Sequence, residues 1–244
     1  MMSLKLSACG FVDGAGFGGS AGRKPWEGAP ERLRWGTFSS APFERFGRMD
    51  ALSKYAAIAV ELLGLPPAES AREDMAILLG SEHGSRAADV DFFRTVPATG
   101  HCRDASPLLF TYTLPSIAIG EIAIRHRIMG PNACLMAGDE GGLLALWEGA
   151  RLVESGEAAS CVCVGCDAIK PHAYAFLIER NATRALCDVE RADSGAADVE
   201  GRDAPARLCG FLVEGREDML CLPAPTSLGI RQVLNVRRSH GRAG

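Results

Sequence analysis

Short apolar runs alternate with longer stretches of helical periodicity along this 244-residue chain. The runs Leu4–Val12, Met75–Leu79 and Ala158–Gly165 predict buried strands. The stretches Asp50–Leu63 and Glu140–Glu157 carry apolar residues on one helical face and predict long helices. Buried strands that alternate with helices are typical of an α/β domain whose mostly parallel sheet is covered on both faces. We therefore expect an α/β fold.

The remaining segments extend this prediction. Further strands are expected at Asn132–Ala137, Leu208–Glu214 and Met219–Leu222, and further helices at Pro115–Ile124 and Pro171–Ala185. Loops are expected at Asp13–Pro30, which is rich in Gly and Pro, at Ser81–Pro107 and at Asp188–Pro205, while Leu228–Val236 is ambiguous. No internal repeat and no linker is evident, so we predict one domain over residues 1–244.

Composition excludes several classes of function. The net charge is −4 and no segment is dominated by Lys or Arg, so nucleic acid is not an expected partner. No run of about 18 apolar residues occurs, and the start lacks a signal-peptide pattern, so no membrane association is expected. Nine cysteines, an odd number found mostly inside apolar runs, favour a reducing cytoplasm over a disulfide framework.

Two motifs that resemble cofactor or metal sites have simpler interpretations. Gly14–Gly19 has the spacing of a dinucleotide-binding loop, but Gly and Pro follow where a helix should begin. Cys161, Cys163 and Cys166, with His172 nearby, form a single cluster, whereas structural zinc sites usually combine two. These cysteines are better explained as core residues of a buried strand. We expect neither a cofactor nor a metal.

The most informative local pattern lies at Asn132–Glu140. It reads as a strand, a tight turn of small residues and the start of a helix, with Asp139 at the corner. A helix N-terminus favours an anion there, because its N–H groups are unpaired. The same corner is where a nucleophile elbow holds a thiolate beside an oxyanion donor. The structural alternative is that Asp139 only caps the helix.

The chain resembles β-ketoacyl synthases of the thiolase superfamily, and within them the group of β-ketoacyl synthase-like N-terminal domain proteins. The resemblance spans roughly Met49–Glu214 and is carried by these motifs in the family's order: Arg48-Met49-Asp50, Leu114–Arg125, Gly130-Pro131-Asn132, Gly141–Leu146, Gly165–Ala168 and Phe211–Glu214. It implies a thiolase-like half, with a mostly parallel, five-stranded mixed sheet flanked by helices. Phe211–Glu214 would be the strand that closes this half.

Two departures from the family decide the expected activity. The family's Thr-Ala-Cys falls on Ala137-Gly138-Asp139 without a gap, so Asp139 replaces the acyl-accepting cysteine. Cys134 stands five residues earlier, inside the strand, and does not substitute for it. The resemblance places the family's acid/base histidines in a second half, and the chain stops at Gly244 before such a half. We therefore do not expect a condensing enzyme acting alone.

The resemblance implies a non-catalytic, chain-length-factor-like subunit that partners a complete β-ketoacyl-[acyl-carrier-protein] synthase in fatty acid, polyketide or aryl polyene biosynthesis. It would form a heterodimer with the synthase, or a homodimer, by joining sheets edge to edge, and would meet acyl carrier protein. A lone half should also leave a large apolar face uncovered. Two alternatives stay open. Asp139 could serve a decarboxylase or hydrolase of acyl thioesters, assisted by His83 or Glu140. The chain could instead be a module that binds acyl chains or carrier protein.

Overall fold

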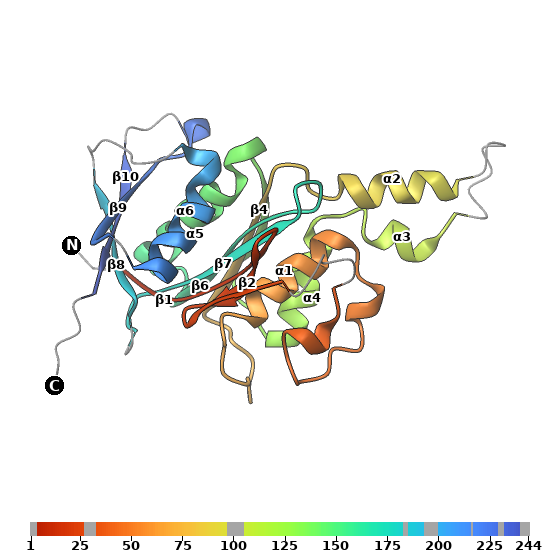
Figure 1. The fold of residues 1–244 in the computed structure, drawn as a ribbon, viewed down its shortest axis with the longest axis horizontal. Helices are drawn as coiled ribbons and strands as arrows, with labels where there is room; N and C mark the ends of the chain where they lie inside the picture. The colour runs from red at the N-terminus through yellow and green to blue at the C-terminus, as the bar shows by residue number, and fades with distance from the viewer. Residues whose placement is uncertain are drawn as a thin grey trace.

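A computed structural model describes residues 4–26, 33–96, 105–182, 185–192, 200–215, 217–228 and 232–239 (Figure 1). Ten strands within these ranges form one mixed sheet in the order β5-β4-β6-β7-β1-β8-β10-β9, and the hairpin β2–β3 is attached to β1. The strands are β1 Leu4–Asp13, β2 Gly16–Gly19, β3 Gly22–Pro25, β4 Met75–Ser81, β5 Asn132–Met136, β6 Ser160–Asp167, β7 His172–Glu179, β8 Cys187–Ala192, β9 Met219–Pro223 and β10 Val233–Arg238. The α-helices are α1 Ala51–Glu61, α2 Arg86–Thr95, α3 Pro107–Thr111, α4 Ser116–His126, α5 Gly141–Ser155 and α6 Ala204–Glu214.

The predicted α/β class is correct and the predicted sheet is not. In place of five mostly parallel strands there are ten, and two of the nine pairings between them, β4–β5 and β4–β6, are parallel. Parallel neighbours need a long crossover, whereas antiparallel neighbours need only a turn. The prediction assumed a helix after every buried strand, but β6 turns directly into β7.

Two elements have the opposite secondary structure to the one predicted. Pro171–Ala185 was assigned to a helix, but His172–Glu179 is the central strand β7, which is paired on one side with β6 and on the other with β1. Leu208–Glu214 was assigned to a strand, but it belongs to α6, so the family-like closing strand is absent at Phe211–Glu214. Leu208, Phe211 and Leu212 share one helical face, which is buried. Short apolar runs do not distinguish a buried helix from a buried strand.

Three predicted loops also contain regular structure. The first holds the hairpin β2–β3, whose glycines let it approach α1 closely: a Cβ added at Gly19 would lie 2.6 Å from the carbonyl oxygen of Leu62. Residues 27–30 of that loop lie outside the described ranges. The second contains α2, and the third contains β8 and the start of α6, while residues 97–104 and 193–199 are likewise not described.

The other elements are confirmed and form the layers of the domain. Asp50 caps α1 by accepting hydrogen bonds from the backbone N–H groups of Ser53 at 3.0 Å and Leu52 at 3.3 Å. Helices α1 and α4 contribute to the apolar core on one face of the sheet, and α5 and α6 to the core on the other. Cys161 and Cys163 lie in the second core, and Cys166 in the first. No helix among the described residues combines the length and apolarity that a membrane crossing requires.

The topology contains an internal repeat that the sequence does not reveal. In the first copy, α5 leads to β6, which pairs with β7, which pairs with β1. In the second copy, α6 leads to β9, which pairs with β10, which pairs with β8. The copies meet where β1 and β8 pair antiparallel, with Leu4 opposite Val189. Each helix is also preceded by a three-residue 3-10 turn. The expectation of no repeat is therefore wrong.

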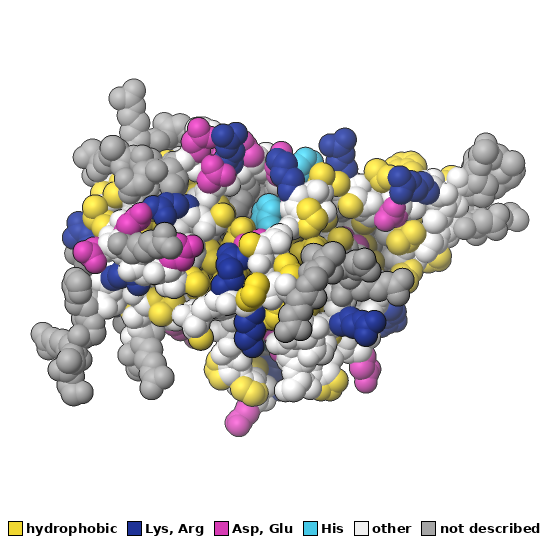
Figure 2. Space-filling view, viewed as in Figure 1, with side chains coloured by type: hydrophobic (Ala, Val, Ile, Leu, Met, Phe, Trp, Pro, Cys, Tyr) yellow, Lys and Arg dark blue, Asp and Glu magenta, His cyan; other side chains and the backbone are white. Residues whose placement is uncertain are grey.

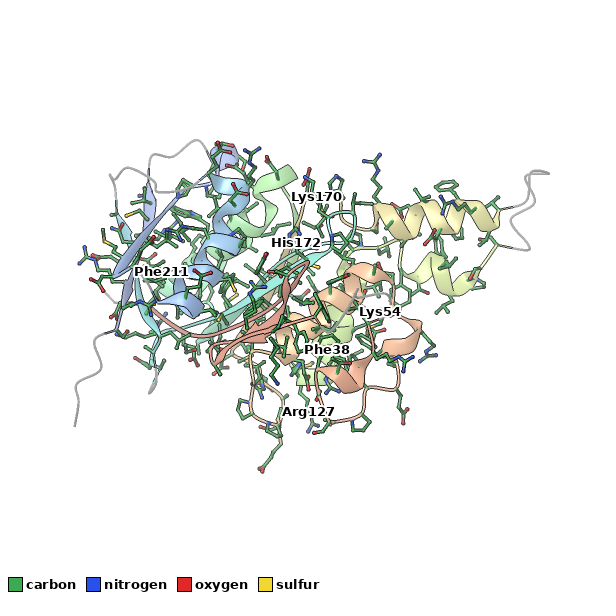
Figure 3. All side chains as sticks on the ribbon, in the orientation of Figure 1. Phe38, Lys54, Arg127, Lys170, His172 and Phe211 are labelled. Atoms are coloured by element: carbon green, nitrogen blue, oxygen red, sulfur yellow. The ribbon has the colours of Figure 1, made fainter. Side chains whose placement is uncertain are left out.

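The second copy covers the face that was expected to be bare. Trp147 of α5 is 1% exposed, and the guanidinium of Arg191 in β8 lies 4.5 Å from the centre of its ring. On α6, Phe211 is 2% exposed and contacts Arg238 of β10 in the same manner (Figure 3). The face of the sheet beneath α5 is therefore covered by α6 and its strands and is not an uncovered apolar face.

Candidate functional site

Asp139 lies at a strand-to-helix corner, as the sequence predicts. Strand β5 ends at Met136, a 3-10 turn spans Gly138–Glu140, and α5 begins at Gly141. Gly138 has φ +55°, a left-handed conformation that glycine adopts at little cost. The sharp reversal at this glycine brings Asp139 to the N-terminal end of α5.

Glycines allow the backbone at the start of α5 to pack directly against the sheet. A Cβ added at Gly80, near the end of β4, would lie 1.8 Å from the carbonyl oxygen of Gly141. A Cβ added at Gly165 of β6 would lie 3.1 Å from the Cα of Gly142. Any larger side chain at Gly80 would displace the helix, and with it the corner.

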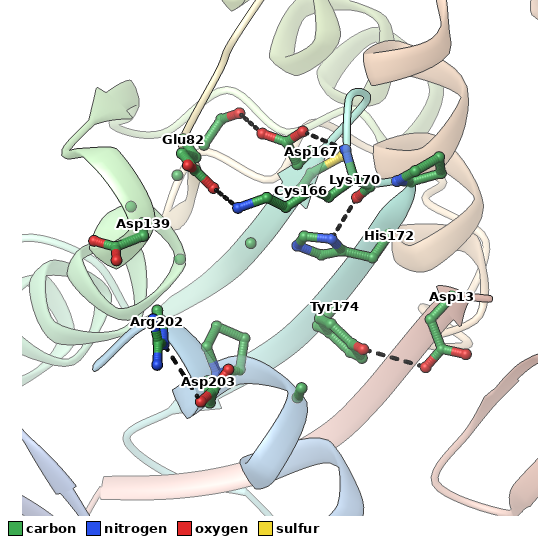
Figure 4. Close-up of a pocket in the computed structure, with 18 of the residues that line it drawn as sticks. Asp13, Glu82, Asp139, Cys166, Asp167, Lys170, His172, Tyr174, Arg202 and Asp203 are labelled. Atoms are coloured by element: carbon green, nitrogen blue, oxygen red, sulfur yellow. Dashed lines mark hydrogen bonds and ion pairs between the residues drawn. The ribbon is translucent and has the colours of Figure 1, made fainter. Parts of the chain in front are cut away.

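A cavity of about 510 Å³ opens beside this corner (Figure 4). It lies where the ends of β1, β4 and β6 meet the first turns of α5 and α6, and its lining residues are Asp13, Gly14, Gly80, Ser81, Glu82, Asp139, Gly141, Gly142, Gly165, Cys166, Asp167, Lys170, Pro171, His172, Tyr174, Arg202, Asp203, Pro205 and Ala206. None of these is Leu, Ile, Val, Met, Phe or Trp. The walls therefore mix charged and polar groups with small apolar side chains and carry no large aliphatic side chain.

Asp139 does not cap the helix. No side-chain cap hydrogen bond is formed at the 3-10 turn or at the start of α5. The carboxylate is exposed and has no hydrogen-bond or ion-pair partner among the described residues. Opposite it, the pKa of Lys170 is raised, first by its ion pair with Glu82 at 2.8 Å and to a smaller degree by the charge of Asp139.

His83 is held outside the cavity. Its Nδ1 lies 3.0 Å from Oδ2 of Asp167, and its backbone N–H donates to the same oxygen at 3.0 Å. Burial would raise the pKa of Asp167, but hydrogen bonds from the Lys170 backbone, His83 and the Ile169 backbone outweigh it and lower the pKa. The predicted site residue His83 is thus a partner of a structural carboxylate.

Glu82, His83 and Asp167 bring three potential metal ligands within 4.8 Å of one another. Both oxygens of Asp167 already accept hydrogen bonds, and Glu82 is paired with Lys170. A cation would have to displace these donors, so the set fits a metal poorly.

Glu140 is also engaged elsewhere. Its Oε2 accepts hydrogen bonds from the backbone N–H of Thr226 at 2.9 Å and from the Thr226 hydroxyl at 2.6 Å. The Glu140 side chain thus links the start of α5 to the segment after β9, and it does not line the cavity.

Three side chains that sequence reasoning missed do line it. Nδ1 of His172 lies 2.6 Å from the carbonyl oxygen of Lys170, so Nδ1 is the nitrogen that donates there (Figure 4). In the tautomer that this bond selects, Nε2 is left as an acceptor. The hydroxyl of Tyr174 donates to Asp13 at 3.2 Å, and Asp13 pairs with Arg23 at 2.7 Å. Burial, followed by the charge of Asp13, raises the pKa of Tyr174. The alternation of polar and apolar residues in this strand was the available signal.

No cysteine among the described residues presents a thiol at the corner. Cys134 is half-buried within β5, and burial raises the pKa of its thiol. Cys166 lines the cavity, but its sulfur lies 3.5 Å from the carbonyl oxygen of Leu52 of α1, and burial raises its pKa well above the ordinary value. Neither thiol would be ionised at neutral pH.

Residues 36–201 of this chain match the sequence profile of the β-ketoacyl synthase N-terminal domain. The chain belongs to that family. Among curated proteins, the ketosynthase-like chain is 28% identical over 102 residues to 3-oxoacyl-[acyl-carrier-protein] synthase 2 of Rhizobium meliloti (strain 1021). That match covers 42% of this chain and 24% of the synthase, so the two share only part of the synthase's length.

Solved structures share the fold. One is a ketosynthase (ApeO) in complex with its chain length factor (ApeC) from Xenorhabdus doucetiae, with a TM-score of 0.62 and 14% identity over 98% of this chain and 100% of the matched chain. Another is a type II polyketide synthase acyl-carrier protein in complex with its ketosynthase (AntDE:AntF), with a TM-score of 0.67 and 12% identity over 98% of this chain and 99% of the matched one. At such low identity these likenesses establish the thiolase-like fold of the ketosynthase domain and no more.

Proposed function

We propose that this chain is a non-catalytic, chain-length-factor-like subunit that partners a complete β-ketoacyl-[acyl-carrier-protein] synthase in fatty acid, polyketide or aryl polyene biosynthesis. The observation that carries the proposal is the unpaired carboxylate of Asp139 at the corner where the family holds a cysteine. A carboxylate is a weak nucleophile toward a thioester, and the mixed anhydride it would form hydrolyses readily. The strand-to-helix corner is present, and a carboxylate stands there in place of the sulfur that accepts the acyl group.

The acid/base groups of a condensing enzyme are also missing from the cavity. The sequence has no histidine between His172 and His240, the region that forms the second structural copy. Among the described residues, His172 is the one histidine that lines the cavity, whereas the family's chemistry uses a pair of such groups. Condensation would therefore take place on the partner's residues.

The sheet offers a place for that partner. Strand β5 is the first in the sheet order and pairs only with β4 among the described strands. An unpaired strand edge invites another strand, and a partner's edge strand would extend the sheet across the interface. One solved relative is described as a ketosynthase with its chain length factor, and another as a ketosynthase with its carrier protein. We infer a synthase heterodimer in the cytoplasm that is served by acyl carrier protein.

Co-expression tests the proposal directly. Co-expressed with a full-length β-ketoacyl synthase of the same organism, the chain should co-purify at a fixed ratio, and the pair should condense acyl groups. Asp139→Ala should leave the yield of product unchanged, because Asp139 performs no chemical step. A chain that stays monomeric at micromolar concentration with every candidate synthase would refute the partner role.

A second candidate function rests on the two groups that face the cavity. Asp139 and Nε2 of His172 could act on a short acyl thioester as a hydrolase or decarboxylase. His172 would then take the assisting role that was expected of His83 or Glu140. Loss of turnover in both Asp139→Ala and His172→Phe, with assembly intact, would favour this enzyme. A third function is a module that binds acyl chains or carrier protein, for which the cavity offers no large aliphatic side chain to hold an acyl chain. Binding of acyl carrier protein without any synthase would support its carrier-protein version.

A further inference from the structure

Exposed apolar side chains gather around one end of the sheet. Helices α2 and α3 form a hairpin that extends away from the body beyond β4 (Figure 1). The large hydrophobic residues exposed on this hairpin, here called the hairpin patch, are Val90, Phe93, Leu108, Phe110 and Leu114. Figure 2 shows yellow side chains clustered over this part of the molecule. Clusters of this kind on a surface usually mark a site of protein contact.

The patch is held in place by its own structure. The ring of Phe92 lies 6.0 Å from that of Phe93 and 5.4 Å from that of Phe110, measured between centroids. Phe93 is nevertheless 71% exposed and Phe110 59% exposed. The hydroxyl of Ser85 donates to the carbonyl oxygen of Thr113 at 2.6 Å, which joins the start of α2 to the end of α3. Aromatic rings fixed in this way lose little conformational freedom when they bind.

The patch is continuous with the free edge of β5. Met136, the last residue of β5, is 51% exposed, and its Cε would lie 2.7 Å from a Cβ added at Gly84, just before α2. Pro115, just after Leu114, would lie 3.2 Å from the same Cβ. The end of β5 therefore adjoins both ends of the hairpin.

The charge on α2 indicates what kind of surface would fit. Arg86 and Arg94 are matched by Asp89 and Asp91, so the helix carries no net charge. Arg94 and Asp91 also pair with each other at 3.1 Å. A neutral surface with exposed aromatic rings matches an apolar partner surface, and its binding should depend little on salt.

We propose that the hairpin patch docks onto an apolar surface of the partner synthase, beside the junction at the β5 edge. This inference rests on the proposed function and adds to it the surface that supplies most of the affinity. The synthase is the occupant we choose over a second copy for two reasons. First, the patch continues from the β5 edge, which the proposed function assigns to the synthase. Second, a dimer of two identical chains would have no thiol at either strand-to-helix corner and so no nucleophile for condensation.

The test compares two double variants in the co-expressed complex. Phe93→Ser with Phe110→Ser removes the two most exposed rings of the patch, and both positions are so exposed that thermal unfolding should not change. The matched control, Met219→Ser with Leu228→Ser, removes two exposed hydrophobic residues in and after β9, at the opposite end of the sheet order from β5, which are 44% and 37% exposed. We expect the patch variant to bind the synthase at least about tenfold more weakly. The control should bind as the unmodified chain does, and affinity should change less than about threefold between low and physiological salt.

The outcomes separate this inference from the proposed function. If the unmodified chain does not bind any synthase, the proposed function fails and the inference fails with it. If the unmodified chain binds and the patch variant binds equally well, the inference is wrong while the partner role stands. If the chain alone forms dimers that the patch variant loses, and the synthase does not compete for them, a second copy is the occupant and the assignment to the synthase is overturned.

Discussion

His126, at the end of α4, should make the stability of this domain fall in mild acid. Its imidazole is 11% exposed, and its buried Nε2 has no hydrogen-bond partner. Burial is the largest cause that lowers the pKa of His126 from 6.5 to about 4. The charge of Glu61, whose Oε2 lies 3.6 Å away, opposes it, and the charges of Arg125 and Arg72 add smaller effects that lower the pKa. The folded protein therefore holds this ring neutral, whereas the unfolded chain protonates it near pH 6.5.

The magnitude follows from this difference. A folded pKa below the unfolded one means that the unfolded state binds more protons, so the stability is fully present above pH 6.5 and is lost as the pH falls toward 4. A gap of about 2.5 pKa units corresponds to about 3.4 kcal/mol in total. Between pH 7 and pH 5, where protonation of the unfolded chain is nearly completed, the loss should be about 2 kcal/mol.

Urea unfolding at fixed ionic strength, followed by tryptophan fluorescence, measures this loss. The matched variant is His126→Gln, which keeps a polar side chain of similar reach and cannot be protonated. Because other groups titrate in both proteins, the quantity to compare is the change in unfolding free energy from pH 7 to pH 5. It should be about 2 kcal/mol smaller in the variant. Equal changes in the two proteins, within about 0.5 kcal/mol, would refute a buried neutral His126.

Three further changes probe the corner and the anchoring of the N-terminal segment. Asp139→Cys should create a thiol at the N-terminal end of α5, where the helix lowers the pKa of a thiol. Iodoacetamide should therefore label this thiol at neutral pH faster than any thiol of the unmodified protein. Labelling no faster than in the unmodified protein would contradict the helix-end geometry. Gly80→Ala should lower the unfolding free energy by about 3 kcal/mol in urea titrations, while Gly36→Ala, with open space around its Cβ, should change it by less than about 1 kcal/mol. Arg125→Met should cost about 3 kcal/mol, because the partly buried Glu61 loses the two hydrogen bonds that Arg125 donates at 2.7 and 2.8 Å and keeps only the one from Ser39 among the described residues. Arg94→Met, at an exposed pair, should cost less than about 0.5 kcal/mol.

Local sequence determined the elements that carry their own hydrophobic periodicity, their own capping residue or their own terminating Gly or Pro. The stripe of α1 and its cap Asp50, the helices α4 and α5, the buried strands β4 and β6 and the edge strand β5 could all be predicted with nearly correct bounds. The corner at Asp139 could be predicted as well, because small residues between a strand and a helix leave few other conformations. Hydrogen bonds and packing within one segment are sufficient to specify such features.

Tertiary structure decided what depends on the partners of a segment. His172–Glu179 is a strand because two neighbouring strands satisfy its backbone, and Ala204–Glu214 is a helix because its apolar stripe packs on the sheet beside α5. The cavity brings Asp139 together with His172 and Tyr174, which come from a different strand. A short apolar run is compatible with either structure, and the free energy of burying it depends on residues far away in the sequence. The direction of the strands, the repeat and the walls of the cavity are therefore fixed only when the whole chain packs together.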